Sequence, residues 1–383
     1  MKIAVDCYEV TKYSTGVGRV IDNFLRNLFC LLPEDTFFIL TREKIQGYSE
    51  NQAIQHIIPW KKGYIRWQNG PFVKRLKKIK PDLLIASNYT LPFFNRWPSI
   101  LLVYDISVIA HPEWYRKKIT FTRKFLLERS LEKSTLVIAP SEFTKGEILK
   151  FFKIKAEKVK VVSCGVNDAF SRCSASSIVE WKKKKGLENK KIIGYLGSIF
   201  ARRNMPLLVG AADLLRKEFP ETVLYVIGKD MTHPPQNIGR LLDKDWVKWE
   251  MFIPENELSL FYSAIDVFAY PSEYEGFGLP PLEALFCGSI PVVLKRSSFD
   301  EIYKDMAIMV DEPEVVTIKE ALKRAMTDER AKLEILNRFS QKRLQFSWQK
   351  TSSEFSSIIQ KLKQELPSLK KTGGAGKGES YPL

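Results

Sequence analysis

Two glutamates lie eight residues apart in a segment that follows a short apolar run. Glu275 and Glu283 are separated by glycines and by Pro280-Pro281, a pair that suits the first turn of a helix. A diphosphate at such a helix start would meet unpaired N–H groups and the positive end of the helix dipole. Because an ionised carboxylate accepts hydrogen bonds from hydroxyl groups, we expect Glu275 to contact a sugar and Glu283 a ribose. The residues expected beside the diphosphate are Gly276, Phe277, Gly278 and Leu279.

Two arginines precede a second predicted helix. Arg202 and Arg203 follow the apolar run 191–196, and Asn204 is the expected N-cap of a helix that begins near Pro206. Guanidinium groups bind phosphate in a bidentate manner and stay charged at physiological pH. We therefore expect both arginines to bind the donor diphosphate, together with Gly197 and Ser198. The simpler alternatives are a pair of solvated arginines and, for Glu283, a carboxylate that only stabilises its helix dipole.

A third turn follows the first predicted strand. Gly16 and Gly18 precede an amphipathic helix, and glycines there let the backbone approach a ligand closely. The third glycine of a dinucleotide-binding fingerprint is missing. A ligand contact and a purely structural tight turn both stay open at this position.

Short apolar runs alternate with amphipathic segments, which is typical of a parallel sheet covered by helices. The strands expected in the first half are 2–7, 36–40, 82–86, 100–104, 135–139 and 158–163. After a polar stretch the pattern restarts at 191–196, 222–227, 246–252, 266–269, 290–293 and 307–310. The sequence therefore predicts an α/β fold of two Rossmann-like, doubly wound domains, at residues 1–168 and 175–346. In such folds ligands bind at the carboxyl ends of the strands, where the three turns lie.

The composition excludes several classes of protein. Apolar residues make up 45% of the chain and charged residues 27%, as in globular proteins. The first residues form a predicted strand rather than a secretory signal, and we found no apolar run of about 18 residues, so we expect a cytoplasmic protein. The five cysteines contain no C-x-x-C pair, and the three histidines have no ligand spacing, so no metal or cofactor is expected.

These motifs, in this order, resemble family four of the retaining GT-B glycosyltransferases, a large group that contains many mannosyltransferases. Glu275 and Glu283 match the E-x7-E pair of that family. Further stretches that resemble it are Gly16-Val17-Gly18-Arg19, Asp105-Ile106-Ser107, His111-Pro112-Glu113, Pro140-Ser141-Glu142-Phe143, Gly165-Val166, Ala201-Arg202-Arg203-Asn204 and Asp300-Glu301-Ile302.

The resemblance implies the GT-B fold, in which two Rossmann-like domains face a cleft. The C-terminal domain would bind the donor and the N-terminal domain the acceptor, and a helix at 347–366 would cross back to the first domain. It also implies retention of anomeric configuration without a metal. The residues expected to take part in catalysis are Glu275, Arg203 and Asp105, and the base pocket would surround Phe252. Weaker sugar or acceptor candidates are Tyr104, where many relatives have histidine, His111 and Ser141.

The donor and the reaction leave alternatives open. GDP-mannose is the favoured donor, with uridine- or deoxythymidine-linked sugars next, and the acceptor would be a glycan or a lipid-linked sugar in surface polysaccharide synthesis. A GT-B epimerase or hydrolase of nucleotide sugars would carry similar motifs. The Asp243-Lys244-Asp245 run matches the metal-binding motif of other glycosyltransferases, but it lies in a polar turn before a strand. A net charge of +16 also fits a nucleic-acid-binding protein, although no such module is recognisable.

Basic and aromatic residues are interleaved in three segments of the first half: 60–67, 74–80 and 114–125. Basic residues are attracted to anionic lipid, and aromatic side chains insert at the interface. An anionic membrane surface is therefore an expected partner. The alternative is a set of solvated helix faces whose aromatic residues point into the core. The last residues, 367–383, are too polar and glycine-rich to bury anything.

Overall fold

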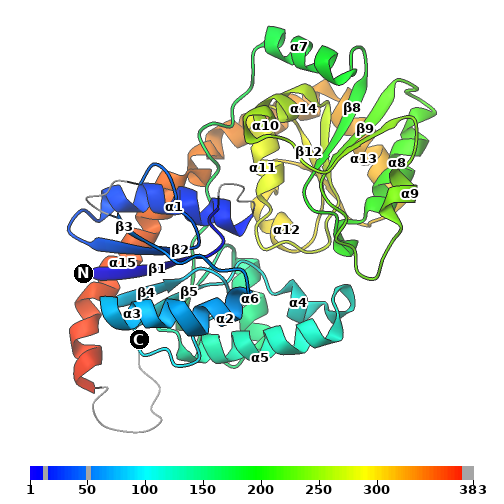
Figure 1. The fold of residues 1–383 in the computed structure, drawn as a ribbon. Coiled ribbons are helices and arrows are strands. Elements are labelled where there is room, and N and C mark those ends of the chain that lie inside the picture. The colour runs from blue at the N-terminus through cyan, green and yellow to red at the C-terminus, as the bar shows by residue number, and fades with distance from the viewer. Residues whose placement is uncertain (12–15, 49–52, 373–383) are drawn as a thin grey trace. The chain divides into compact units, whose positions relative to one another are not determined.

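The computed structural model describes residues 1–11, 16–48 and 53–372, with the side chains of 367–372 excepted. The chain divides into two compact units (Figure 1). The first comprises residues 1–109, 121–165 and 346–383, and the second comprises residues 110–120 and 166–345. The short segment 110–120 thus belongs with the second unit although its neighbours in sequence belong with the first.

The first unit contains a seven-stranded parallel sheet with the order β3-β2-β1-β4-β5-β6-β7. Its strands are β1 (Lys2–Cys7), β2 (Thr36–Thr41), β3 (Ala53–Ile57), β4 (Leu83–Ala86), β5 (Ser99–Leu102), β6 (Leu136–Ala139) and β7 (Val159–Val161). Central strands such as β4 are buried at every residue, which is why they appear in the sequence as continuous apolar runs. The predicted strands lacked β3, because this edge strand is only partly buried and contains Gln55 and His56.

Helices cover both faces of the first sheet (Figure 1). They are α1 (Val17–Leu31), α2 (Tyr64–Trp67), α3 (Val73–Ile79), α4 (Ser107–Ala110), α5 (Lys117–Lys133), α6 (Glu142–Phe151) and α15 (Trp348–Thr372), with a π-helical turn at Gln68–Phe72. The C-terminal helix α15 packs on α1, where the rings of Phe24 and Phe355 lie 4.5 Å apart. The helix also corrects the expected start of the tail. It continues through residues 367–372, since the leucine and lysines after Pro367 are good helix formers. Residues 373–383 lie outside the described part of the chain.

The second unit contains a six-stranded parallel sheet with the order β10-β9-β8-β11-β12-β13. Its strands are β8 (Lys191–Leu196), β9 (Thr222–Ile227), β10 (Val247–Glu250), β11 (Val267–Tyr270), β12 (Pro291–Leu294) and β13 (Ile308–Val310). Its helices are α7 (Ala175–Lys185), α8 (Met205–Arg216), α9 (Ile238–Leu242), α10 (Leu258–Ala264), α11 (Leu279–Phe286), α12 (Ser298–Ile302), α13 (Val315–Thr327) and α14 (Glu329–Lys342).

Both sheets have a strand order that reverses beside their first strand. The chain builds outward from β8 through β9 to β10, then returns to place β11 on the other side of β8. The prediction of two doubly wound Rossmann-like folds is therefore confirmed. In such sheets ligands bind at the carboxyl ends of the strands beside the reversal. In the second unit this point lies after Leu196 and Tyr270.

Candidate functional site

Two turns meet at the carboxyl edge of the second sheet. The first follows β8 and contains a single 3-10 turn, Ala201–Arg203, directly before α8. The second follows β11 and leads into α11. The backbone N–H of Glu273 donates a 2.8 Å hydrogen bond to the carbonyl of Arg202, which joins the two turns. The topology thus brings together the arginines and the first glutamate of the predicted site.

Arg203 and Glu275 form a buried ion pair. Nε of Arg203 lies 2.9 Å from Oε1 of Glu275, and Nη1 donates to the carbonyl of Ser198 at 2.6 Å. Arg202 lies further away, with its Nε 3.9 Å from the same carboxylate oxygen. Both arginines are less than a tenth exposed. The alternative of two solvated arginines is therefore wrong.

The surroundings of Glu275 favour its ionised form. Burial alone would raise the pKa of this carboxyl group, but Arg203, Arg202 and a hydrogen bond from Ser272 together hold the pKa below its ordinary value. Oγ of Ser272 donates to the carboxylate at 3.0 Å. A buried carboxylate that stays charged can accept hydrogen bonds from hydroxyl groups of a ligand.

The backbone of Glu275 is held by two serines from the next loop. Its N–H donates to Oγ of Ser297 at 3.1 Å, and Oγ of Ser298 donates to its carbonyl at 2.8 Å. Sequence reasoning missed both serines, as well as Ser272. The signal that could have found Ser297 and Ser298 is their place between β12 and the start of α12, at the same edge of the sheet.

Packing holds the start of α11 in place. Gly278 precedes the helix in the left-handed conformation, with φ of 82°, and the ring of Phe299 fills the space that a side chain would need. The hydroxyl of Tyr303 donates to the carbonyl of Gly278. Packing therefore fixes the direction of the helix start, where Leu279 is the first helical residue and Pro280 and Pro281 follow.

Glu283 lies inside α11 and is oriented by a tyrosine from α10. The hydroxyl of Tyr262 donates to Oε2 of Glu283 at 2.7 Å, and both side chains are buried. A buried tyrosine hydroxyl normally finds a polar partner, and here that partner is the second predicted ligand carboxylate. Tyr262 was not predicted, because its role depends on a contact between two helices.

Residues from the segment 110–120 also lie in this unit. Nη1 of Arg202 donates to the hydroxyl of Tyr115 at 2.7 Å. The ring of His111 stacks on Trp114 with a centroid distance of 4.1 Å and meets the ring of Tyr274 edge-on at 5.3 Å. Nδ1 of His111 lies 2.9 Å from the carboxylate of Glu113. His111 thus belongs to an aromatic group near the arginine turn.

Other predicted donor residues of this unit lie at the same sheet edge. Gly197 follows β8, with φ of 136°, and the guanidinium of Arg203 occupies the space beside it. Phe252 follows β10 and is 60% exposed. An exposed aromatic ring at the carboxyl edge offers a surface on which a nucleotide base can stack.

The predicted N-cap at the arginine turn is confirmed in position but not in its side-chain contacts. Asn204 is the N-cap residue of α8, but its side chain makes no capping hydrogen bond. Instead Nδ2 donates to the carbonyl of Pro271 at 3.2 Å and to the carboxylate of Glu273 at 2.9 Å. The left-handed backbone of Asn204, with φ of 50°, turns the amide toward the other loop. Its side chain therefore connects the two turns.

The predicted residues of the first unit have mainly local contacts. Gly16 has φ of 53° and Gly18 is buried in the first turn of α1. The carboxylate of Asp105 accepts from the backbone N–H and the hydroxyl of Ser107, at 2.8 and 2.6 Å. Ser141 is the N-cap of α6 and accepts from Thr144 N–H at 3.1 Å. Residues 12–15, which precede Gly16, lie outside the described part.

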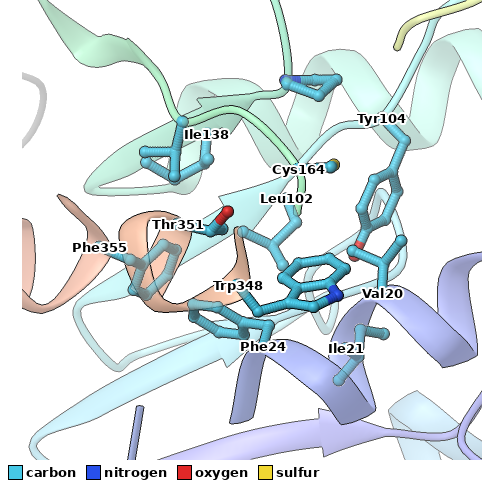
Figure 2. Close-up of a pocket in the computed structure, with 12 residues that line it drawn as sticks. Val20, Ile21, Phe24, Leu102, Tyr104, Ile138, Cys164, Trp348, Thr351 and Phe355 are labelled. Carbon is cyan, nitrogen blue, oxygen red and sulfur yellow. The ribbon is translucent and has the colours of Figure 1, made fainter. Parts of the chain in front are cut away.

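Tyr104 lines a small apolar hollow of the first unit (Figure 2). Side chains from α1, α15 and the ends of β5 and β6 surround a space of about 40 Å³. Burial raises the pKa of Tyr104, and within the described residues its hydroxyl has no hydrogen-bond partner. Small-molecule pockets measure about 300–1,000 Å³. By its size this hollow alone does not hold a sugar.

The described residues form neither a metal-binding cluster nor a membrane-spanning helix. Asp243 and Asp245 lie in an exposed turn before β10. Among residues 1–11, 16–48 and 53–372 no three His, Cys, Asp or Glu side chains are grouped so that they could hold a metal ion. Within the same ranges no helix has the length and apolar character needed to cross a bilayer.

Comparison with known families adds a second line of evidence. Residues 177–344 match the model of glycosyl transferases group 1, and residues 15–170 match the model of Glycosyltransferase Family 4. The chain is 27% identical over 285 residues to O-antigen chain mannosyltransferase B of Escherichia coli. The alignment covers 73% of this chain and 74% of that protein.

Solved structures share the fold at lower identity. HepE of Anabaena, in complex with UDP-glucose, aligns with a TM-score of 0.75 at 16% identity over 94% of this chain and all of that chain. WaaG, a glycosyltransferase involved in lipopolysaccharide biosynthesis, aligns with a TM-score of 0.73 at 16% identity over 93% of this chain and 99% of that chain. Together with the two family models, these likenesses show that the chain is a glycosyltransferase similar to family four, with the Rossmann-like domains of the GT-B fold.

Proposed function

We propose that the protein transfers a hexose from a nucleoside diphosphate to a glycan or lipid-linked acceptor, with retention of anomeric configuration, in the synthesis of a surface polysaccharide. The favoured donor is GDP-mannose, as the resemblance to family four implies. The relative in Escherichia coli is named an O-antigen chain mannosyltransferase, which supports mannose as the sugar. A uridine-linked sugar is the second candidate, because the HepE structure holds UDP-glucose. The enzyme would act in the cytoplasm, at the inner face of the membrane.

The observation that carries the proposal is the ion pair of Arg203 and Glu275. In a nucleotide sugar the diphosphate is joined directly to the anomeric carbon, so the groups that bind the two parts must be neighbours. The carboxylate of Glu275 is suited to the sugar hydroxyls, and the guanidinium 2.9 Å away is suited to the phosphate. The buried pair would therefore lie across the bond that breaks.

Charge development explains why arginine is used. Negative charge grows on the diphosphate as it departs, while the sugar becomes oxocarbenium-like. Arg203, Arg202 and the N–H groups of Phe277, Gly278 and Leu279 would stabilise that charge in a site where the charged groups are already oriented. Under this proposal no metal ion is needed. Glu275 orients the sugar, and no residue is assigned as a covalent nucleophile.

The remaining donor contacts are part of the same proposal. Glu283, held by Tyr262, would accept hydrogen bonds from the ribose, and Phe252 would stack on the base. In the first unit Gly16 and Gly18 would approach the donor, with Asp105 toward the sugar. Tyr104 is kept only as a weaker sugar candidate, because it lines the small apolar hollow. His111 and Ser141 are kept as weaker acceptor candidates.

A transfer assay tests the proposal. Purified protein is incubated with GDP-mannose, UDP-glucose or dTDP-linked hexose and with a detergent extract of bacterial lipid-linked sugars, and the label that enters the lipid fraction is counted. The proposal is supported if transfer occurs with one of these donors and only when the acceptor is present. Turnover of the donor at the same rate without acceptor would favour a hydrolase or an epimerase.

A further inference from the structure

The first half of α5 leaves its large apolar side chains exposed. Phe121 is 77% exposed and Phe125 is 57% exposed, and Ile119 is 43% exposed. Residues one turn apart lie on the same face of a helix, so Phe121 and Phe125 form one apolar strip. Exposed phenylalanines of this kind are unusual in a protein surface and mark an interaction site when they cluster.

A loop packed against the second half of α5 carries two more exposed aromatic side chains. Phe93 and Phe94, which follow β4, are 36% and 84% exposed. The loop is held against α5, because Leu91 N–H donates to Oγ of Ser130 at 3.0 Å and Arg129 donates to the carbonyl of Pro92 at 3.3 Å. The guanidinium of Arg129 also lies 5.3 Å from the ring of Phe93. We call Phe93, Phe94, Phe121 and Phe125 the aromatic patch.

The charge around the aromatic patch is positive. From residue 114 to residue 127 the chain contains five basic residues and no acidic one: Arg116, Lys117, Lys118, Arg123 and Lys124. Lys117 and Lys124 lie two helical turns apart on the side of α5 that carries Phe121. Glu128 and Glu132 follow on the second half of the helix, so the basic surface is confined to its start.

The other two basic and aromatic segments lack this combination. Trp67 is fully buried, and Trp60 and Tyr64 pack against the core of the first unit. In α3 the apolar residues Leu76 and Ile79 are buried, which leaves a solvated basic face. For segments 60–67 and 74–80 the simpler interpretation therefore holds, with apolar side chains directed into the core.

We propose that the aromatic patch and the lysines beside it dock the protein on an anionic lipid bilayer. Basic side chains are drawn to the negative surface potential of anionic lipids, and phenylalanine partitions into the interface below the headgroups. A neutral protein partner would not account for five basic residues gathered beside exposed aromatic side chains. The proposal is independent of the donor and of the catalytic residues.

Vesicle sedimentation with the full chain, without nucleotide, tests the proposal. The probes are vesicles of phosphatidylcholine alone and vesicles that contain phosphatidylglycerol as well, at low and at high salt. Wild-type protein is expected to sediment with the anionic vesicles at low salt and to be released as salt rises, since surface charges are screened. The double variant Phe121→Ser with Phe125→Ser and the double variant Lys117→Glu with Lys124→Glu should each bind at least about tenfold more weakly.

The matched control is Lys77→Glu with Lys78→Glu in α3, which changes the net charge equally and, like Phe121 and Lys124, lies in the first unit. This variant should bind within about threefold of wild type if the site is specific. Circular dichroism checks that every variant folds. The proposal is wrong if wild type stays in the supernatant at low salt, or if the control loses as much binding as Lys117→Glu with Lys124→Glu. It is also wrong if the phenylalanine variants only dissociate a dimer and leave vesicle binding unchanged.

Discussion

Arg203 and Glu275 are paired inside the second unit before any ligand is bound, with Nε 2.9 Å from Oε1. The pair joins the turn after β8 to the turn after β11, so it holds the two predicted donor-binding segments together. Because both side chains are buried, each charge is balanced by the other, and Arg203 helps to hold the pKa of Glu275 below its ordinary value. Loss of either should therefore affect folding as well as activity, and the two effects can be separated.

Arg203→Ala should lower kcat by about 10²–10³-fold, since it removes an oriented cation that meets charge developing on the leaving group. It should also lower the free energy of unfolding by about 3–5 kcal/mol, because Glu275 stays buried with its main counter-charge removed. The double variant Arg203→Ala with Glu275→Gln should recover much of that stability and none of the activity. Urea unfolding gives the stability, and steady-state kinetics give kcat, for wild type, Arg203→Ala and the double variant. Wild-type kinetics in Arg203→Ala would refute the assignment.

Tyr262→Phe should raise KM for the donor while kcat stays within about twofold of wild type. The hydroxyl of Tyr262 orients Glu283, and a hydrogen bond to a charged group contributes about 1.5–3 kcal/mol. Glu283→Gln should raise KM further, because the ribose contact itself is weakened. Donor saturation curves for both variants give the comparison. A fall in kcat without a change in KM would place Glu283 at the reacting centre instead.

Gly278→Ala should destabilise the second unit by more than about 1 kcal/mol and reduce donor binding. The residue has φ of 82°, and Phe299 occupies the space where Cβ would lie. The control is Gly239→Ala in α9, where nothing lies within 4 Å of the added carbon and the helix should gain about 0.5–1 kcal/mol. Thermal unfolding of the two variants decides the matter. Equal effects would show that the turn tolerates a side chain.

Asp6 should make stability depend on pH. It is fully buried at the end of β1, and its carboxylate accepts from Tyr64 at 2.6 Å and from Tyr8 N–H at 3.1 Å. Burial raises the pKa of Asp6 to about 7 from an ordinary value of 3.8, so the folded chain prefers the protonated acid. Between these values the folded chain binds more protons than the unfolded one, and the free energy of unfolding should fall as pH rises.

The variant Asp6→Asn cannot lose this proton. Relative to wild type it should therefore gain stability as pH rises from about 5 to about 8. Urea unfolding at both values measures the gain. A difference between the two proteins that stays constant with pH would contradict the buried, protonated state of Asp6.

The sequence predicted the elements that carry long apolar runs and the residues next to their ends. The limits of β1, β8 and β9 were predicted to the residue, because buried parallel strands are continuous apolar segments. The part that could not be predicted depends on contacts between distant segments. Tyr115 meets Arg202 from 87 residues away, and Tyr262 meets Glu283 from 21 residues away. No local pattern marks such partners.

The side-chain role of Asn204 shows the same limit. Asparagine favours helix caps, so its side chain was expected to hydrogen-bond within its own helix. The side chain instead forms tertiary hydrogen bonds with Pro271 and Glu273. The burial of Arg202 and Arg203 also follows from tertiary packing. In the sequence alone they are two charged residues in a turn.

The most direct test is a calorimetric titration of GDP and UDP into the purified protein in EDTA. We predict that one of the two nucleotides binds without metal and that Arg203→Ala and Glu283→Gln each weaken this binding. Adding Mg²⁺ or Mn²⁺ should change the affinity only modestly, because side chains and helix N–H groups would bind the diphosphate. Binding that is absent in EDTA and restored by a divalent metal would contradict the proposed metal-free site.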